Sequence, residues 1–462
     1  MKSPYFEKYD VIVIGSGAGG AIAANKMVSQ GLKTLMIEEG EDSYVGNSDR
    51  FTLEGMSRYY RDGGHLATLS NPAIAWAEGK CLGGGTEINS GIYHRPSDAL
   101  LSHWSSQNGI GWLKSNSFHA NFTEVEQMLN ITKEDLNKSH VSTLLTTASD
   151  SLGWSWVLPP RWISWEGDKM VRHTMRNTYI EEGIKKGLTV LTSTKVLKIL
   201  QKNSNAIGVV IKTDKAGIIK IYSDNVILSA GTVGSAKILK ASGFSNNIGK
   251  SVKFHPMLKF GLYFPDYIFR DIDLSPVQIK QFSPKITIGA AASSPGIYGA
   301  TFARTSLKPL ELLNRYKHTT LLHASLSLEG SARLLPGGFL KYHFTKDDRV
   351  TLLKALEKSQ ELSFRMGAAE VLIAGKKAIP SKSILNNFDT RNLDITAVHV
   401  TSSLPMGNLS SNPVDCLGAF KELGNLFIVD GSILPDAPGV NPQGTIMAMA
   451  TYLSANIARS IS

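Results

Sequence analysis

Cysteine is scarce in this 462-residue sequence, which contains only Cys81 and Cys416. Two cysteines form neither a disulfide framework nor a cysteine-rich metal site. Long apolar runs are absent as well, because none reaches the roughly 18–20 residues that cross a membrane. Residues 1–10 lack the apolar core that a signal peptide needs. These absences favour a cytoplasmic protein, while peripheral contact with a membrane surface stays open.

Motifs of several other protein classes are also missing. There is no H-E-x-x-H or paired C-x-x-C pattern for a metal ion, no G-x-S-x-G elbow and no G-x-x-x-x-G-K-[ST] phosphate loop. Acidic residues are the minority, since 39 Asp and Glu stand against 49 Lys and Arg, a formal net charge of +10. The basic residues are scattered, and no nucleic-acid motif occurs. We expect no metal and no nucleic-acid partner, while a weak attraction to an anionic membrane or an acidic substrate stays open.

The composition that remains is that of a globular protein. Hydrophobic residues make up 42% and charged residues 19% of the chain, and its length suits two or three domains. The patterns predict helices over 97–153 and 178–186, an irregular connection over 154–165, alternating strands and helices over 256–395, and a helix that begins near Pro442. Strands are predicted at 9–14, 33–37, 189–201, 206–212, 218–222, 225–230 and 425–429, with a hairpin between the fourth and fifth of them.

A β-α-β unit opens the chain. An apolar strand runs into the pattern G-x-G-x-x-G, formed by Gly15, Gly17 and Gly20, and an alanine-rich helix and a second strand follow. The three glycines allow a tight turn, the approach of a pyrophosphate to the backbone, and close packing of the helix on the strand. The helix N-terminus, near Ala18, offers free N–H groups to phosphates, and Glu38 is placed to bind a ribose diol. The unit predicts a dinucleotide site for either a nicotinamide or a flavin.

Later segments decide between these cofactors through a resemblance. Residues 79–91 (GKCLGGGTEINSG) closely resemble the flavin-contacting segment of the glucose–methanol–choline oxidoreductases. Residues 226–235, 248–256, 399–407 and 430–442 resemble further segments of that family, in the family's order. The resemblance implies FAD as the cofactor. It also implies an α/β fold, in which a discontinuous Rossmann-like domain with a parallel central sheet joins a substrate domain with an antiparallel sheet and helices.

The resemblance further implies how the chain is divided. The FAD-binding domain is expected to comprise residues 1–100, 186–255 and 396–462, and the substrate-binding domain residues 101–185 and 256–395. The substrate would enter between the two domains, over the flavin.

The matching segments also imply contacts with FAD. The flavin-contacting segment passes beside the isoalloxazine ring, Val196 contacts the adenine, and Asp430 contacts the ribityl chain or the pyrophosphate. Ile88 stands where some relatives attach FAD through a histidine, so a non-covalent FAD is predicted. With the first unit included, the expected cofactor-binding residues are Gly15, Gly17, Ala18, Gly20, Glu38, Gly83, Gly84, Thr86, Asn89, Val196, Ala230, Gly231, Asp430, Gly431, Asn441 and Pro442.

Oxidation of an alcohol needs a base for the hydroxyl proton and an acceptor for the hydride. In the family the base is a histidine whose partner is His or Asn, and His399 and Asn441 match these positions. His399 is expected to take the proton, Asn441 to hold the oxygen, and flavin N5 to receive the hydride. Asn441 is also a candidate N-cap, because Pro442 suits the first position of a helix.

Several alternatives stay open. His65, His94 and His255 are further candidates, each with a surface or structural interpretation, and Glu87 either points toward substrate or bonds a backbone N–H. An FAD-dependent alcohol oxidase or dehydrogenase competes with a lyase on the same fold, with a non-catalytic flavin-binding protein, and with a flavin reductase, which would need a second dinucleotide motif. The alcohol, the electron acceptor (oxygen, a quinone or a protein) and the oligomeric state are not determined by the sequence.

Overall fold

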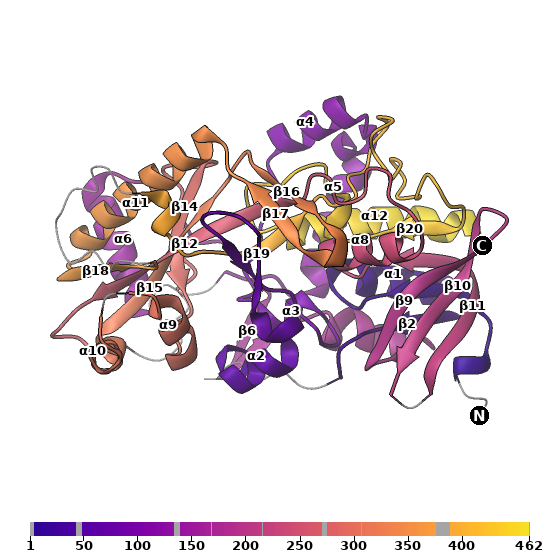
Figure 1. The fold of residues 1–462 in the computed structure, drawn as a ribbon, viewed down its shortest axis with the longest axis horizontal. Coiled ribbons are helices and arrows are strands. Elements are labelled where there is room, and N and C mark those ends of the chain that lie inside the picture. Colours follow the sequence, from indigo (N-terminus) through magenta and orange to yellow (C-terminus); the bar gives the residue numbers. More distant parts are fainter. Residues whose placement is uncertain are drawn as a thin grey trace.

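The computed structural model describes residues 4–42, 49–133, 139–167, 169–214, 216–269, 275–305, 307–375 and 389–461. Within these residues two large sheets dominate, one of seven strands and one of nine, and they lie toward opposite ends of the long axis (Figure 1). Both chain ends lie beside the seven-stranded sheet (Figure 1). Helices and strands mix throughout, and the expected α/β fold is confirmed.

The seven-stranded sheet has a parallel part and an antiparallel part. The parallel strands are, in spatial order, β8 (Thr189–Leu191), β2 (Thr34–Ile37), β1 (Tyr9–Ile14), the end of β11 (Gly217–Leu228) and β20 (Leu426–Ile428). Val11, Ile12 and Val13 are fully buried, as the unbroken apolar run predicts for a parallel strand covered on both faces. Helix α1 (Ala18–Ser29) packs on β1 and β2, and α12 (Gln443–Ile461) packs on α1.

Two predicted strands are one in the structure. The segments 218–222 and 225–230 join into β11, whose first half pairs antiparallel with β10 (Asn205–Thr213) and whose second half pairs parallel with β1. The polar residues between the two segments resemble a turn, but they stay extended because β1 supplies pairing partners from Tyr9 onward. Conversely, the predicted strand 189–201 is divided into β8 and β9 (Thr194–Lys202), because Ser193 turns the chain with φ of 49°.

The nine-stranded sheet is built around β12 (Lys253–Tyr263). Its strand order is β3 (Leu66–Ala67), β4 (Ile74–Trp76), β19 (Ile395–Thr401), β12, β15 (Thr319–Leu326), β14 (Ile286–Ala291), β13 (Gln278–Ile279) and β5 (Trp156–Val157), with β18 (Glu370–Ile373) also paired to β12. All pairs except β4–β19 are antiparallel. The segment 154–165, predicted to be irregular, contributes β5 and the start of β6 (Ile163–Glu166), which pairs with β7 (Lys169–Arg172) in a separate hairpin.

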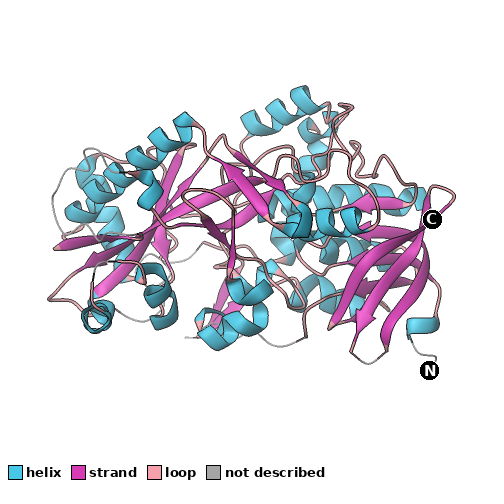
Figure 2. Cartoon of the chain, viewed as in Figure 1, coloured by secondary structure: helices cyan, strands magenta, loops and turns pink. Residues whose placement is uncertain are grey.

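The two faces of this sheet differ in polarity. Leu258 and Phe260 of β12 are buried and point toward the face on which α11 (Lys346–Arg365) packs. Lys259, between them, points to the other face and lines a cavity. Helices lie on both sides of the strands in this half of the molecule (Figure 2). The sheet therefore presents an apolar face to the core and a partly polar face to the cavity.

The predicted helical region 97–153 contains α4 (Asp98–Asn108), α5 (Asn116–Met128) and α6 (His140–Leu152), apart from residues 134–138, which lie outside the described residues. Helix α5 packs on α12, beside the seven-stranded sheet, whereas α6 packs on α11, beside the nine-stranded sheet. The domain boundaries stay a prediction. No helix within the described ranges is both long and apolar enough to cross a membrane.

Candidate active site

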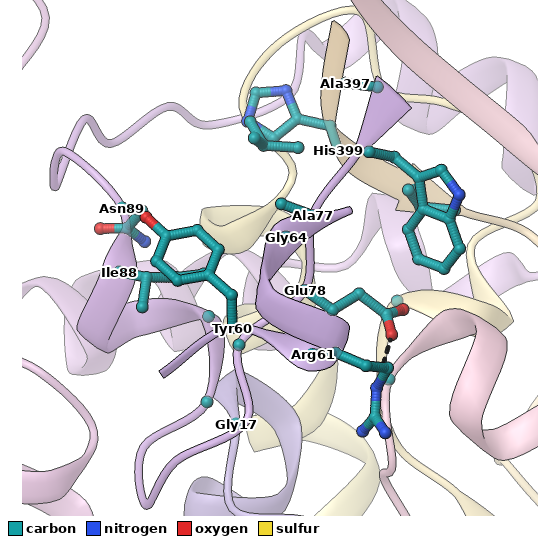
Figure 3. Close-up of a pocket in the computed structure, with 18 of the residues that line it drawn as sticks. Gly17, Tyr60, Arg61, Gly64, Ala77, Glu78, Ile88, Asn89, Ala397 and His399 are labelled. Atoms are coloured by element: carbon teal, nitrogen blue, oxygen red, sulfur yellow. Dashed lines mark hydrogen bonds and ion pairs between the residues drawn. The ribbon is translucent and has the colours of Figure 1, made fainter. Parts of the chain in front are cut away.

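A cavity of about 760 Å³ is lined by residues of both sheets. Its wall begins at the loop after β1, passes along residues 84–92, and ends on the polar face of the nine-stranded sheet. Figure 3 shows His399 and Ala397 above the cavity, Gly17 below it, and Ile88, Asn89 and Tyr60 on one side. Most of the expected site residues meet here, although they come from segments that are hundreds of residues apart.

The glycines of the first loop differ in what surrounds them. Gly15 has φ of +94°, and a Cβ added there would stand 2.2 Å from the carbonyl oxygen of Ser229. A Cβ on Gly20 would stand 2.0 Å from the carbonyl oxygen of Gly15, so this glycine lets α1 pack against the turn. A Cβ on Gly17 would meet nothing within 4 Å, because Gly17 faces the cavity. The geometry matches the tight turn, the close packing and the open approach that the sequence predicts.

Glu38 joins this loop to the segment 79–91. Its carboxylate accepts hydrogen bonds from Ser16 N (3.1 Å), Ser16 Oγ (2.7 Å) and Gly40 N (2.9 Å), and Ser16 Oγ accepts one from Gly83 N (3.0 Å). Burial raises the pKa of Glu38, and these donors partly offset that rise. Glu38 also lines the cavity, where its binding of a ribose diol stays a prediction.

An ion-pair network that the sequence does not reveal lies beside Glu38. Arg61 contacts Glu39 (Nη1 to Oε2, 2.8 Å) and Glu78 (Nε to Oε2, 3.1 Å; dashed in Figure 3). Lys195 also contacts Glu39, at 3.1 Å. Burial alone would lower the pKa of Arg61, but the two carboxylates outweigh it and raise the pKa. The four residues are far apart in sequence, so no local motif predicts their contact.

Arg172 holds the segment 79–91 in place, a contact that the sequence does not predict. Its guanidinium donates hydrogen bonds to the backbone oxygens of Thr86 (2.6 Å), Glu87 (2.7 Å) and Asn89 (3.1 Å), at the end of α3 (Gly85–Ile88). Such a short helix leaves most of its carbonyls without partners, and Arg172 satisfies three carbonyls at its end. The side chain of Asn89 in turn donates to Gln443 Oε1 (2.6 Å), at the start of α12.

Three of the expected cofactor-binding residues lie behind the cavity wall. Gly20, Gly83 and Thr86 do not line the cavity, whereas the other thirteen do. Thr86 Oγ1 donates to Gly83 O (2.7 Å) and accepts from Met175 N (3.2 Å), so both residues support the wall. Glu87 lies behind it too, with its carboxylate toward Thr174, Arg172 and the backbone of Arg176, and burial raises its pKa. Of the two open interpretations of Glu87, the structure favours the bond to backbone.

Asp430 closes the wall after β20. Its carboxylate accepts hydrogen bonds from Ser235 Oγ (2.6 Å), Ser432 N (2.8 Å) and the Ser432 hydroxyl, while burial raises its pKa. Ala230 and Gly231, after β11, lie beside it on the cavity wall. The carboxyl ends of two parallel strands thus meet where ligands of such sheets usually bind.

His399 sits on a β-bulge of β19, on the opposite side of the cavity from Gly17 (Figure 3). Phe254 pairs with Val400 and Pro256 with Ala397, so His255 of β12 opposes both Val398 and His399. A bulge redirects a side chain out of the strict alternation of a strand. His399 Nδ1 lies 3.0 Å from His255 Nδ1, with the ring centroids 5.2 Å apart, and His399 Nε2 lies 3.4 Å from Asn441 Nδ2.

These contacts define the protonation of His399. Asn441 Nδ2 is a donor, so His399 Nε2 is the unprotonated nitrogen, and His399 Nδ1–H donates to His255 Nδ1. Burial, with the nearby His323 and His94, lowers the pKa of His399 to about 3, and burial with His399 also lowers the pKa of His255. His399 therefore presents a neutral imidazole nitrogen to the cavity at neutral pH. His255, left open by the sequence, is the residue that positions it.

Asn441 is not the N-cap of α12. The helix begins at Gln443, and the carbonyl of Pro442 accepts the first helical hydrogen bond from Ile446 N (2.9 Å). The amide of Asn441 therefore remains directed at His399. Of the other candidates, His65 lines the cavity, and His94 lies behind the wall with Nε2 2.9 Å from Gln278 Oε1. No group of three potential metal ligands gathers anywhere in the described part of the chain.

Comparison with known proteins defines the class. Residues 56–257 match the N-terminal family model of the GMC oxidoreductases, and residues 334–450 match the C-terminal one. The chain belongs to the GMC oxidoreductase family. It is 27% identical to an uncharacterised GMC-type oxidoreductase of Sinorhizobium fredii, over 96% of this chain and 93% of that protein. It is 26% identical to a long-chain-alcohol oxidase of Arabidopsis thaliana, over 98% of this chain and 68% of that protein.

Solved structures show the same fold. Pyridoxine 4-oxidase from Mesorbium loti superposes with a TM-score of 0.76 at 17% identity, over 97% of this chain and 99% of that chain. Formate oxidase of Aspergillus oryzae superposes with a TM-score of 0.77 at 13% identity, over 99% of both chains. The glycine-lined wall, open at Gly17, fits a dinucleotide. The protein is an FAD-dependent oxidoreductase that acts on CH–OH donors.

Proposed function

We propose that the enzyme oxidises the carbinol of a small-molecule alcohol to a carbonyl, with His399 as the base and Asn441 as the group that holds the oxygen. The observation that supports this most is the unprotonated His399 Nε2, which faces the cavity 3.4 Å from the Asn441 amide. A neutral imidazole accepts a proton, and an amide N–H donates to the alcohol oxygen, so the two groups complement one hydroxyl.

The step balances with these residues. FAD, when bound, supplies the acceptor for the hydride at its N5. His399 Nε2 takes the hydroxyl proton, the electron pair of the broken O–H bond becomes the second bond of the carbonyl, and the carbinol hydrogen leaves as a hydride with the electron pair of the broken C–H bond. His255 Nδ1 accepts from His399 Nδ1–H throughout, which keeps the imidazole oriented and disperses its developing charge.

The attachment of FAD is proposed to be non-covalent. Ile88 lines the cavity at the position where some relatives carry the linking histidine, and its side chain has no nucleophile. The binding then rests on the backbone and the polar groups of the wall.

His399→Ala tests the assignment. The purified variant should keep its visible flavin spectrum and lose about 10²- to 10⁴-fold in the rate at which an alcohol bleaches the flavin without oxygen, the usual effect of removing a general base. His343→Ala, on the exposed side of the hairpin β16–β17, is the matched control and should react like the wild type. Turnover of His399→Ala within about tenfold of wild type would rule out His399 as the base.

The same assay separates the alternatives. The wild type is screened with alcohols without oxygen, and then with oxygen, a quinone or a protein as the acceptor. A flavin that no alcohol bleaches would favour the lyase or the non-catalytic flavoprotein over the proposed oxidation.

A further inference from the structure

The substrate end of the cavity carries a cation for which the described residues supply no partner. Lys259, in the middle of β12, lines the cavity with its side chain. In the described part of the chain its ammonium group makes no hydrogen bond or ion pair. The ammonium of Lys259 is half-buried in the cavity wall and loses part of its hydration there, a cost that a bound counter-charge would offset. The structure therefore raises the question of what Lys259 binds.

Lys259 belongs to a polar row across the sheet. It lies opposite His323 of β15, His323 lies opposite Gly289 of β14, and Gly289 lies opposite Gln278 of β13. Residues directly opposite each other point to the same face, here the one that lines the cavity. Gly289 leaves room for the histidine ring, because a Cβ there would stand 3.2 Å from His323 Cε1.

The row offers one charged donor and one neutral acceptor. His323 Nδ1 lies 2.9 Å from the carbonyl oxygen of Ala290, so Nδ1 carries the ring proton and Nε2 is left as an acceptor. Burial lowers the pKa of His323 to about 4, which keeps the ring neutral, and burial lowers the pKa of Lys259 to about 8, which leaves it largely protonated at pH 7. Lys259 thus supplies the positive charge of the row.

The acidic side chains that line the cavity gather at one end of it. The carboxylates of its wall lie at the nucleotide end, and each is held by protein donors: Glu38, Glu39, Glu78 and Asp430. The charged groups around the substrate end are Lys259 and Lys280, and the histidines beside them are neutral at pH 7: His94, His255, His323 and His399. A positive field at one end of a cavity favours an anion there.

From these observations we infer that the alcohol carries a carboxylate remote from its carbinol, and that Lys259 binds this carboxylate. The inference rests on the proposed function. A single ammonium suits a singly charged group better than a phosphate. Lys259 lies four residues beyond His255 on β12, about 13 Å along the strand, so a spacer of several carbons separates the acid from the carbinol. Lys259 is then a specificity residue.

Binding of octanoate tests the acid site without any turnover. Isothermal titration of the flavin-loaded enzyme should show octanoate binding that Lys259→Met weakens by roughly 10- to 100-fold, the effect of losing a hydrogen bond to a charged group. Lys220→Met, on the exposed side of β11, changes the net charge equally and should leave the affinity unchanged. Lys259→Arg should retain most of the affinity, which separates loss of charge from misfolding. No octanoate binding, or equal binding by Lys259→Met, would overturn the inference.

Flavin reduction by matched alcohols tests the substrate class. 8-Hydroxyoctanoate should reduce the wild-type flavin with a kcat/KM at least roughly tenfold above that of 1-octanol or 4-hydroxybutanoate. Lys259→Met should lose this preference through KM and keep the rate with 1-octanol. A wild type that prefers 1-octanol would overturn the inference and leave the proposed oxidation intact. Lys259-dependent octanoate binding without reduction by any alcohol would contradict the proposed oxidation and leave the acid site standing.

Discussion

At the scale of single residues, the His255–His399 pair shows how a neighbouring side chain defines the protonation of the proposed base. Either imidazole alone could carry its proton on either nitrogen. The 3.0 Å contact between the two Nδ1 atoms and the Asn441 amide at Nε2 leave one arrangement in which both contacts join a donor to an acceptor. Burial also lowers the pKa of the histidines in and around this pair, so these rings are neutral at pH 7.

His94 provides a measurable consequence. Burial, followed by the nearby Lys280, lowers its folded pKa to about 4, below the ordinary 6.5, so the folded state favours the neutral ring. As the pH falls below 6.5 the unfolded chain binds a proton first, and the stability that the neutral ring contributes is lost between pH 6.5 and about 4. At pH 5.5 the loss is about 1.4 kcal/mol. His94→Gln, which keeps a donor for Gln278, should lose that much less stability than wild type between pH 7.5 and 5.5.

Urea unfolding of both flavin-loaded proteins at the two pH values measures this difference. Parallel pH dependences would show that His94 is not held neutral in the folded state.

At the scale of elements, the first loop and α1 combine two demands on glycine. Gly20 is needed for the fold, since its neighbour is the backbone oxygen of Gly15, whereas Gly17 is bounded only by the cavity. The same motif therefore contains one glycine for packing and one for the ligand. The bulge in β19 is a second device at this scale, because it places His399 beside His255.

Gly17→Ala and Gly20→Ala form a matched pair. Gly17 has φ of −69°, so alanine fits its backbone, and the apoprotein should keep its stability within about 0.5 kcal/mol while its affinity for FAD falls at least roughly tenfold. Gly20→Ala should destabilise the apoprotein by about 1–3 kcal/mol or more, because its Cβ overlaps Gly15 O. Urea unfolding and titration of flavin fluorescence provide both values. Wild-type affinity in Gly17→Ala would mean that the cofactor does not approach this residue.

At the scale of the whole molecule, the cavity lies between two sheets whose buried side chains belong to one continuous hydrophobic core. Residues of both sheets line it, so a bound FAD would contact both halves. A ligand that binds only the folded state stabilises it by mass action, about 2.7 kcal/mol at a concentration 100 times its Kd.

Acid treatment of the yellow protein should therefore release free FAD into the supernatant, as expected for a non-covalent cofactor. Apoprotein prepared under milder conditions should regain the flavin spectrum and a higher Tm on addition of FAD, in a single unfolding transition. Flavin that remains with the acid precipitate would show a covalent link and contradict the interpretation of Ile88.

Local patterns were enough for much of the fold. The strand, glycine loop and helix after Tyr9, the buried strand before Asp430 and the helical stretch from 97 onward are present where the sequence predicts them. The errors in the predicted strands occur where pairing with another strand sets the strand boundaries. Strand β11 crosses a polar segment that resembles a turn, and Ser193 divides a predicted strand. Strand boundaries depend on which partner a segment meets, and a single window of sequence does not contain the partner.

By itself, the sequence determined the glycine loop and the order of the family segments, because a turn or a motif is a property of neighbouring residues. His399 with Asn441 as the catalytic pair stays a prediction. Only the tertiary structure decided that His255 contacts His399, that Arg61 and Arg172 hold segments of the cavity wall, and that Lys259 faces the cavity with no counter-charge among the described residues. Those contacts join segments that are distant along the chain. Their electrostatics depend on burial and on opposing charges, which exist only once both sheets enclose the cavity.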